Sequence, residues 1–325
     1  MRELGVERIP IRVQRAGLNP WADLRLRGDY RRLLQRIRPA AYLSFTIKPN
    51  IYGAMAAEGL GIRAIPNVSG IGNAFLRRDP VQQVVTHLSR RGFRRAPAVF
   101  FQNPEDRQLF LDRAIVRPEQ ARLLPGSGVD LGRFAPALPA EGPLTFLLIA
   151  RLVQDKGVLE FVEAARSLRD DLPDARFQLL GGPDEGHRTA ISLGDVNRWV
   201  GEGAIEYLGS TEDVRPFIAS ASAIVLPSYR EGLPRSLLEG AAMARPLIGA
   251  DAPGCREVVE EGVNGYLCKV RDARSLADVM LRFARLPQVE REAMGAAARR
   301  TVEERFSEEL VVRAYLDVLD EVTSS

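Results

Sequence analysis

Short apolar runs alternate with longer stretches of helical periodicity along most of this chain. The short runs, rich in β-branched residues, predict buried strands, and apolar residues recurring every three or four positions predict helices. Strands are expected over residues 6–13, 40–46, 63–68, 98–102, 121–124, 144–150, 176–180, 205–208, 221–226 and 246–250. Helices are expected over residues 23–37, 50–58, 80–95, 104–113, 157–171, 189–200, 236–243, 275–286, 289–304 and 307–322. This alternation predicts an α/β protein with doubly wound parallel sheets.

The length of 325 residues favours two domains, because single cores stop growing near ~250–300 residues. Residues 134–143, FAPALPAEGP, contain three prolines and no periodicity, which is typical of a linker. No apolar run reaches the roughly 18 residues of a membrane-spanning helix. The first ten residues lack the apolar core of a signal peptide, and the two cysteines, Cys255 and Cys268, are expected to be buried thiols. A cytoplasmic protein is expected.

Charge is distributed unevenly between the two halves. Residues 1–142 contain 23 Lys and Arg against 12 Asp and Glu, whereas the remainder contains 22 against 30. A basic half suggests an anionic partner such as a membrane surface. The alternative is compositional, because only three of the 45 cationic residues are lysines.

The stretch from Leu226 to Glu239 is the first candidate site. A buried strand ends there in a loop with one glycine and two prolines, and a helix follows. A helix N-terminus suits a phosphate, whereas the carboxylates Glu231 and Glu239 suit hydroxyl groups, since an ionised carboxylate only accepts hydrogen bonds. Phosphate and hydroxyl recognition side by side suggest a nucleotide-sugar. The alternative is a solvated loop and helix face.

Two cations form the second candidate site. Arg151 and Lys156 follow the strand over 144–150, and Gly157 precedes the next helix. The guanidinium fork of arginine matches phosphate oxygens, and lysine adds a compact positive charge. Together they are suited to a leaving diphosphate, although two ordinary surface cations are the alternative.

Arg151 and Lys156, followed by Glu231-x7-Glu239, resemble the donor site of family 4 of the retaining glycosyltransferases, which have the GT-B fold of two Rossmann-like domains. The strings SFTIKPNIYG (44–53), NVSGIGN (67–73), FQNPE (101–105), LPGSGVD (124–130), REGLPRSLLE (230–239) and PGCRE (253–257) resemble one branch of it. That branch transfers hexose derivatives, often N-acetylated, from UDP-sugars onto undecaprenyl-diphosphate-linked sugars in capsule, O-antigen and glycan assembly.

The resemblance implies a role for each matching residue. Arg151 and Lys156 hold the donor diphosphate, Glu231 accepts hydrogen bonds from the transferred sugar, and Glu239 binds the ribose hydroxyls. The remaining donor-binding residues are Gly232, Leu233 and Arg235 near the phosphates, with Gly181, Gly182, Leu208 and Gly209 where the base lies. The acceptor-side candidates are Lys48, Asn50, Ser69 and Gly70. Ser69 stands where many members carry a histidine, and a purely structural role for Lys48 and Asn50 is equally open.

The resemblance also implies the reaction and the partners. Transfer proceeds with retention and rests on stabilising the leaving diphosphate. No metal and no cofactor are expected, since His87 and His187 are isolated in the sequence. The partners are a nucleotide-sugar, a lipid-linked saccharide acceptor and the anionic inner face of the cell membrane, with no nucleic acid. The helix around 84–95, which mixes apolar residues with four arginines, is the candidate membrane contact; an ordinary solvated helix is the alternative.

The domains implied are residues 1–135, with the helix over 305–325 packing back on them, and residues 136–304. The start of the chain resembles the stretch before the third strand of the family, so the first domain is expected to lack its initial strands, roughly 45–60 residues by the size of a βαβ unit. A nucleotide-sugar-binding but inactive homologue is therefore the alternative function. A dinucleotide-dependent dehydrogenase is disfavoured, because Pro183 interrupts the glycine-rich run over 181–186. A UDP-sugar 2-epimerase is disfavoured by the Glu231-x7-Glu239 arrangement.

Overall fold

The computed structural model describes residues 5–13, 19–71, 75, 80–138 and 142–324. The chain folds into two compact units, Met1–Leu124 with Ala314–Ser325 (unit 1) and Pro125–Arg313 (unit 2). These boundaries differ from the expected 135/136 and 304/305, because Val129, Phe134 and Phe306 pack into the core of unit 2. Part of the expected linker, residues 139–141, lies outside the described residues. No described helix has the length and apolar character needed to cross a membrane.

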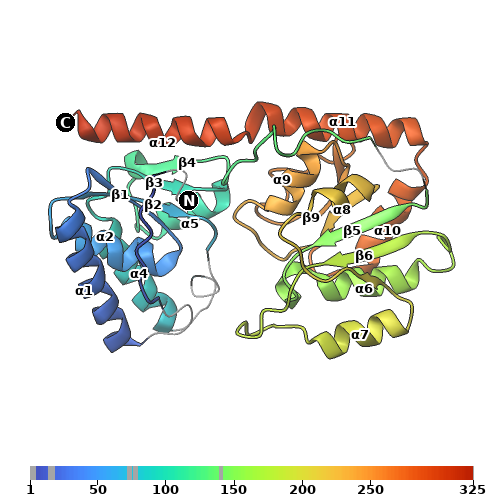
Figure 1. Cartoon of the computed structure of the whole chain (residues 1–325), viewed down its shortest axis with the longest axis horizontal. Coiled ribbons are helices and arrows are strands. Elements are labelled where there is room, and N and C mark those ends of the chain that lie inside the picture. The colour runs from blue at the N-terminus through green and yellow to red at the C-terminus, as the bar shows by residue number, and fades with distance from the viewer. Residues whose placement is uncertain (1–4, 14–18, 72–74, 76–79, 139–141, 325) are drawn as a thin grey trace. The chain divides into compact units, whose positions relative to one another are not determined.

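Unit 1 is built on a parallel sheet with the strand order β1-β2-β3-β4 (Figure 1). Its strands are β1 Ala41–Phe45, β2 Arg63–Val68, β3 Val99–Phe101 and β4 Ala121–Leu123. Its helices are α1 Pro20–Ile37, a π-helical turn η2 Pro49–Gly53, α2 Ala54–Glu58, α4 Pro80–Phe93, α5 Pro104–Asp112 and the 3-10 turn η3 Pro118–Gln120.

Local sequence explains how α1 begins and what it buries. The Asn19 side chain accepts a hydrogen bond from the Ala22 amide, and Pro20 occupies the first turn, so α1 starts three residues before the expected position. Leu26, Tyr30 and Leu34, spaced four residues apart, form its buried stripe.

The C-terminal part of the last helix, α12 Glu308–Thr323, covers one face of the unit 1 sheet (Figure 1). The Tyr315 ring lies 4.8 Å from the Phe100 ring, and the Asn67 amide donates to the Tyr315 hydroxyl at 2.7 Å. Arg122 of β4 pairs with Glu321 at 2.6 Å.

The prediction of a strand over residues 6–13 is wrong, since the structure has no strand there. Pro10 has no backbone amide to donate to a neighbouring strand. Ile11 and Val13 pack against the core of unit 1 as irregular chain.

Unit 2 contains a parallel sheet of six strands in the order β10-β9-β8-β5-β6-β7. The strands are β5 Thr145–Ile149, β6 Arg176–Leu180, β7 Glu206–Tyr207, β8 Ala223–Leu226, β9 Leu247–Ala250 and β10 Gly265–Cys268. The helices are η4 Gln154–Lys156, α6 Val158–Ser167, α7 Leu193–Gly201, α8 Arg215–Ser220, α9 Arg235–Ala242, α10 Ala273–Ala284 and α11 Gln288–Arg305. Strand β10 and helix α8 are absent from the sequence-based expectation.

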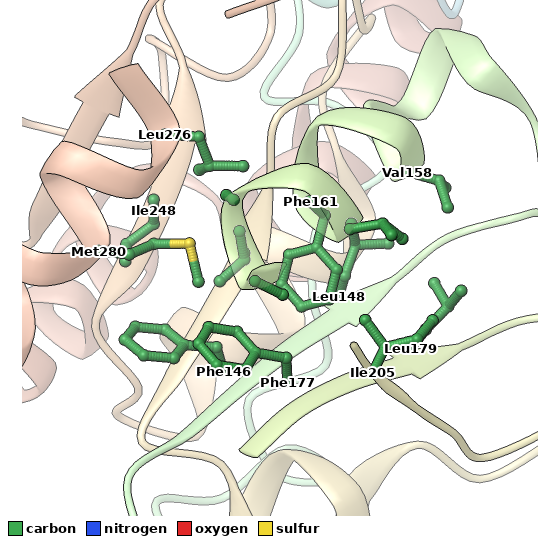
Figure 2. Packing of buried hydrophobic residues seen from close by; sticks show 14 of the residues in the cluster. Phe146, Leu148, Val158, Phe161, Phe177, Leu179, Ile205, Ile248, Leu276 and Met280 are labelled. Carbon is green, nitrogen blue, oxygen red and sulfur yellow. The ribbon is translucent and has the colours of Figure 1, made fainter. Parts of the chain in front are cut away.

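The side chains of strand β5 are buried on both faces of this sheet. Phe146 and Leu148 point into one core with α6, α7 and α10, whereas Leu147 points into a second core with α9 and α11. Figure 2 shows Phe146 and Leu148 packed with Phe161, Phe177 and Met280 in the first core. An uninterrupted apolar strand is thus the signature of a parallel strand buried between two helical layers.

Candidate functional site

The strand order of unit 2 has a single reversal, and the candidate site lies there. Strand β5 pairs with β6 on one side and with β8 on the other, so the chain winds first in one direction and then in the opposite one. In doubly wound sheets, ligands bind in the crevice beyond the carboxyl ends of the strands at such a switch point. The two sequence-predicted loops, which follow β5 and β8, both emerge there.

A hollow of about 420 Å³ lies between these loops. It is lined by Ile149, Ala150, Arg151, Lys156, Leu226, Glu231, Leu233, Pro234, Arg235, Ser236 and Glu239. The structure therefore brings together Arg151, Lys156, Glu231 and Glu239, all predicted for the donor site, with the predicted residues Leu233 and Arg235. Gly232, also predicted there, belongs to the same loop.

Lys156 and Glu231 face each other across the hollow. The Lys156 ammonium is paired with the Glu231 carboxylate, and their side chains are only 21% and 12% exposed. Gly157 makes this approach of the two loops feasible: its φ is +73°, and a Cβ atom there would lie 2.2 Å from the Pro227 carbonyl oxygen. The carboxylate of Glu231 thus holds the Lys156 ammonium in position.

Arg151 is paired with a carboxylate that the sequence reasoning missed. Its guanidinium binds Asp184, which follows β6, and the Arg151 side chain is 58% exposed. The signal available in the sequence was a carboxylate just beyond a strand adjacent to β5, since the ends of neighbouring parallel strands share one edge of the sheet. Because Arg151 is exposed, its guanidinium can exchange the Asp184 carboxylate, which is 28% exposed, for a phosphate.

Glu239 lies on α9, at the side of the hollow. Its side chain is 12% exposed and accepts from Arg235 at 2.9 Å. Burial raises the pKa of the Glu239 carboxyl, and the guanidinium of Arg235 offsets part of this effect. The first turn of α9 carries backbone amides that have no partner within the helix by its geometry, as anion recognition requires.

The glycines predicted at the base position form a neighbouring group at the ends of β6 and β7. The Gly181 amide donates to the Gly209 carbonyl at 2.8 Å, and Leu208 donates to Leu179 at 2.9 Å. A Cβ atom on Gly181 would lie 1.7 Å from the Ala150 carbonyl oxygen, so glycine is needed beside the end of β5. Gly182 follows on the same edge, and none of the four predicted residues is among those lining the hollow described above.

The acceptor-side candidates all lie in unit 1, at the ends of β1 and β2. Asn50, Ser69 and Gly70 line a small cavity of about 20 Å³. The Asn50 amide donates to the Asn67 carbonyl at 2.7 Å, while its Oδ1 atom is buried with no hydrogen-bond partner among the described residues. Lys48 points elsewhere: its ammonium donates to Asp23 at 2.8 Å, with both side chains at most 10% exposed. This geometry supports the structural alternative for Lys48.

The helix expected to contact a membrane, α4, packs most of its apolar residues against the core of unit 1. Val85 and Phe93 of α4 are buried in the core of unit 1, whereas Val84 is 46% exposed. Its basic end is exposed, and Arg91, Arg94 and Arg95 all share one carboxylate, that of Glu58. What remains on the surface is a cluster of positive charge.

The described residues contain no group of three or more His, Cys, Asp or Glu side chains arranged to hold a metal ion. Both cysteines are buried free thiols, as expected, and burial raises the pKa of each. Metal-independent chemistry stays a prediction.

Residues 143–285 match the family described as "Glycosyl transferases group 1". The chain is 27% identical over 340 residues to N,N'-diacetylbacillosaminyl-diphospho-undecaprenol alpha-1,3-N-acetylgalactosaminyltransferase of Campylobacter jejuni, covering 99% of this chain and 88% of that protein. It is 24% identical over 255 residues to UDP-Gal:alpha-D-GlcNAc-diphosphoundecaprenol alpha-1,3-galactosyltransferase of Escherichia coli, covering 72% of this chain and 64% of that one.

Solved structures agree on the fold. The crystal structure of Anabaena HepE in complex with UDP superposes with a TM-score of 0.76 at 17% identity, over 91% of this chain and 82% of that one. Sucrose-phosphate synthase from Thermosynechococcus elongatus superposes with a TM-score of 0.77 at 18% identity, over 94% and 79%. The resemblance drawn from the sequence is thereby confirmed: the chain has the GT-B fold, and its residues 143–285 match the family of glycosyl transferases group 1.

Proposed function

We propose that this chain transfers a sugar, a hexose or an N-acetylated hexose, from a UDP-sugar to a polyprenyl-diphosphate-linked saccharide with retention of anomeric configuration. One observation carries the proposal: two cations and two carboxylates, Arg151, Lys156, Glu231 and Glu239, surround one hollow at the switch point of the sheet. The names of the two relatives, both of which specify undecaprenol-linked saccharides, support this class of acceptor.

Each charged residue binds a different part of the donor. Arg151 and Lys156 bind the diphosphate, with the first turn of α9 and its neighbours Gly232, Leu233 and Arg235. Glu231 accepts hydrogen bonds from the transferred sugar, and Glu239 accepts them from the ribose. The base lies along the edge formed by Gly181, Gly182, Leu208 and Gly209, where the Tyr207 hydroxyl, donating to the Gly181 carbonyl at 2.9 Å, fixes the backbone.

The reaction follows from where charge develops. The bond between the anomeric carbon and the phosphate oxygen breaks, and the negative charge that grows on the leaving diphosphate is met by Arg151 and Lys156. The acceptor hydroxyl attacks from the same face of the sugar, and its proton passes to the departing phosphate oxygen. Neither a metal nor a cofactor has a part in this proposal. On the acceptor side, Asn50, Ser69 and Gly70 are the candidate contacts of the acceptor. Lys48 helps to position them by stabilising the turn on which it lies.

A panel of UDP-sugars, offered with undecaprenyl-diphosphate-linked saccharides in the presence of EDTA, tests the proposal. We expect transfer from at least one UDP-sugar, with the product retaining the donor's anomeric configuration by NMR. Binding of UDP without transfer to any acceptor would instead support a nucleotide-sugar-binding protein without turnover. Absence of both would contradict the donor site itself.

Replacing Glu239 with glutamine tests two properties of this residue: its part in UDP binding, and the loss of protein stability caused by its buried charge. The raised pKa means that the folded protein holds this proton more tightly than the unfolded chain does, so ionising Glu239 lowers the free energy of unfolding as pH rises through the ordinary carboxyl pKa to the raised value. At pH 7 we expect Glu239→Gln to raise the Tm by about 2 °C and to weaken UDP binding about tenfold. The gain in Tm should vanish near pH 4. An unchanged UDP affinity would remove Glu239 from the site, and Glu290→Gln, on the exposed surface of α11, is the control.

We further propose that the basic end of α4 contacts the anionic inner face of the cell membrane, where a lipid-linked acceptor resides. Arg94 and Arg95 are 57% and 71% exposed and share the single carboxylate of Glu58. Because each arginine near an anionic surface contributes about 1 kcal/mol, the double substitution Arg94→Gln with Arg95→Gln should weaken binding to phosphatidylglycerol vesicles roughly 30-fold. Arg166→Gln with Arg198→Gln, which removes two arginines from unit 2, should leave binding unchanged; equal losses in the two proteins would contradict this contact.

A further inference from the structure

The loops that follow β5 and β8 are joined behind the hollow by backbone hydrogen bonds. The Asp155 carbonyl accepts from the Tyr229 amide at 2.9 Å and from the Ser228 hydroxyl at 3.0 Å. Asp155 directly precedes Lys156, and Tyr229 lies two residues before Glu231. Each partner of the Lys156–Glu231 pair is therefore next to a point where the two loops are joined.

The side chain of Tyr229 adds a second, more distant attachment. Its hydroxyl donates to Oε1 of Glu160, in the first turn of α6, at 2.8 Å. Burial, with Glu160 next in effect, raises the pKa of Tyr229 to about 12, so the phenol stays protonated and donates at all physiological pH values. On the same ring lies the guanidinium of Arg271, 4.4 Å from the ring centroid.

The Glu160 carboxylate accepts its hydrogen bond from the Tyr229 hydroxyl. Its Oε2 atom is buried and has no hydrogen-bond partner among the described residues, so Tyr229 supplies the hydrogen bond that its carboxylate receives. A buried carboxylate oxygen without a partner lowers stability, and such a feature is expected where a geometry is maintained for function. Arg271 itself has a φ of +58°, a conformation that non-glycine residues rarely adopt.

We propose that Tyr229, Glu160 and Arg271 form a clamp that positions Glu231 opposite Lys156, and that this clamp selects for the sugar part of the donor. The inference rests on the proposed function, because Glu231 is there the residue that binds the transferred sugar. Tyr229 does not line the hollow, so it is a positioning residue that acts through Glu231. Small errors in placing a group that contacts the reacting sugar are costly, which makes a rigid loop valuable here.

Hydrogen exchange tests the clamp without any substrate. Tyr229→Phe keeps the ring under Arg271 and removes only the hydroxyl. We expect peptides covering residues 227–233 to exchange about tenfold faster in this variant, since a hydrogen bond to a charged group is lost. Tyr266→Phe is the matched control, because Tyr266 also lies under an arginine, Arg282, at 4.1 Å, but belongs to β10. Unchanged exchange over 227–233 in Tyr229→Phe would overturn the clamp.

A double-mutant cycle tests its functional role. Tyr229→Phe should lower kcat/KM for the UDP-sugar about tenfold and change the Kd for UDP less than about twofold, because UDP lacks the sugar that Glu231 binds. In a Glu231→Ala background the same substitution should have no further effect. Glu160→Gln, which still accepts the hydrogen bond, should lose less activity than Glu160→Ala.

The outcomes separate the clamp from the proposed function. Equal losses from Tyr229→Phe in the wild-type and Glu231→Ala backgrounds would overturn the positioning role. A wild-type protein that does not bind UDP would contradict the proposed function, and the hydrogen-exchange result would still decide whether the clamp exists.

Discussion

Lys156→Ala is expected to lower the rate of sugar transfer by about 10²–10³-fold, the loss typical of removing one preorganised group that stabilises charge in the transition state. The ammonium lies on the 3-10 turn after β5 and is only 21% exposed, so bulk water does not replace it easily. Initial rates with saturating UDP-sugar measure the effect on kcat.

The chain offers a matched control, since it contains only three lysines. Lys269→Ala removes a lysine from the exposed surface of the same unit and should retain full activity. Near-normal transfer by Lys156→Ala would contradict the assignment of the diphosphate to this hollow. A comparable loss in both variants would point to a general effect on unit 2 instead.

The second large effect is expected in unit 1, where Lys48→Ala should destabilise the fold by about 3 kcal/mol. Lys48 and Tyr52 both donate to the carboxylate of Asp23, at 2.8 and 3.0 Å, and Asp23 is 4% exposed. Removing the ammonium leaves a buried negative charge whose remaining side-chain partner, among the described residues, is the neutral Tyr52 hydroxyl. Native-state hydrogen exchange of peptides from β1 and β2 should accelerate roughly a hundredfold.

Peptides from β5 and β6 provide the internal control, because they belong to unit 2. The paired substitution Asp23→Asn with Lys48→Met should recover most of the loss, since it removes both charges and leaves no unpaired ion. If Lys48→Ala instead left exchange in β1 and β2 unchanged but lowered acceptor binding, Lys48 would be an acceptor residue and not a structural one.

The sequence predicted most strands of the two sheets, with bounds that agree to different degrees. The bounds of β2 and β6 agree with the expectation at both ends, and the apolar run over 144–150 marked β5 because helices cover both of its faces. Strand β10 was not expected: its four residues, Gly265–Cys268, pair only at the edge of the sheet next to β9 and follow no long apolar run. Helix α7 begins at Leu193, four residues later than expected, because the Ser192 side chain caps it by accepting from the Asp195 amide at 3.1 Å.

For the candidate site, motif and spacing were sufficient to predict which residues gather around the hollow. They were not sufficient to predict how the charges pair. The contact of Arg151 with Asp184 depends on the loop after β6, and that of Tyr229 with Glu160 joins positions 69 residues apart. Likewise, Lys48 belongs to a recognisable motif, but only the fold brings Asp23 of α1 next to it. Local pattern does not encode such partners, because tertiary packing decides which side chains meet.

Calorimetric titration with UDP tests the central claim most directly, because every nucleotide contact proposed here lies in unit 2 and needs no acceptor. We predict saturable binding of one UDP per chain, weakened at least about tenfold by Arg151→Ala or Lys156→Ala and unaffected by Lys269→Ala. No heat of binding to the wild-type protein, or equal affinity in all four proteins, would contradict a nucleotide-sugar site at this switch point.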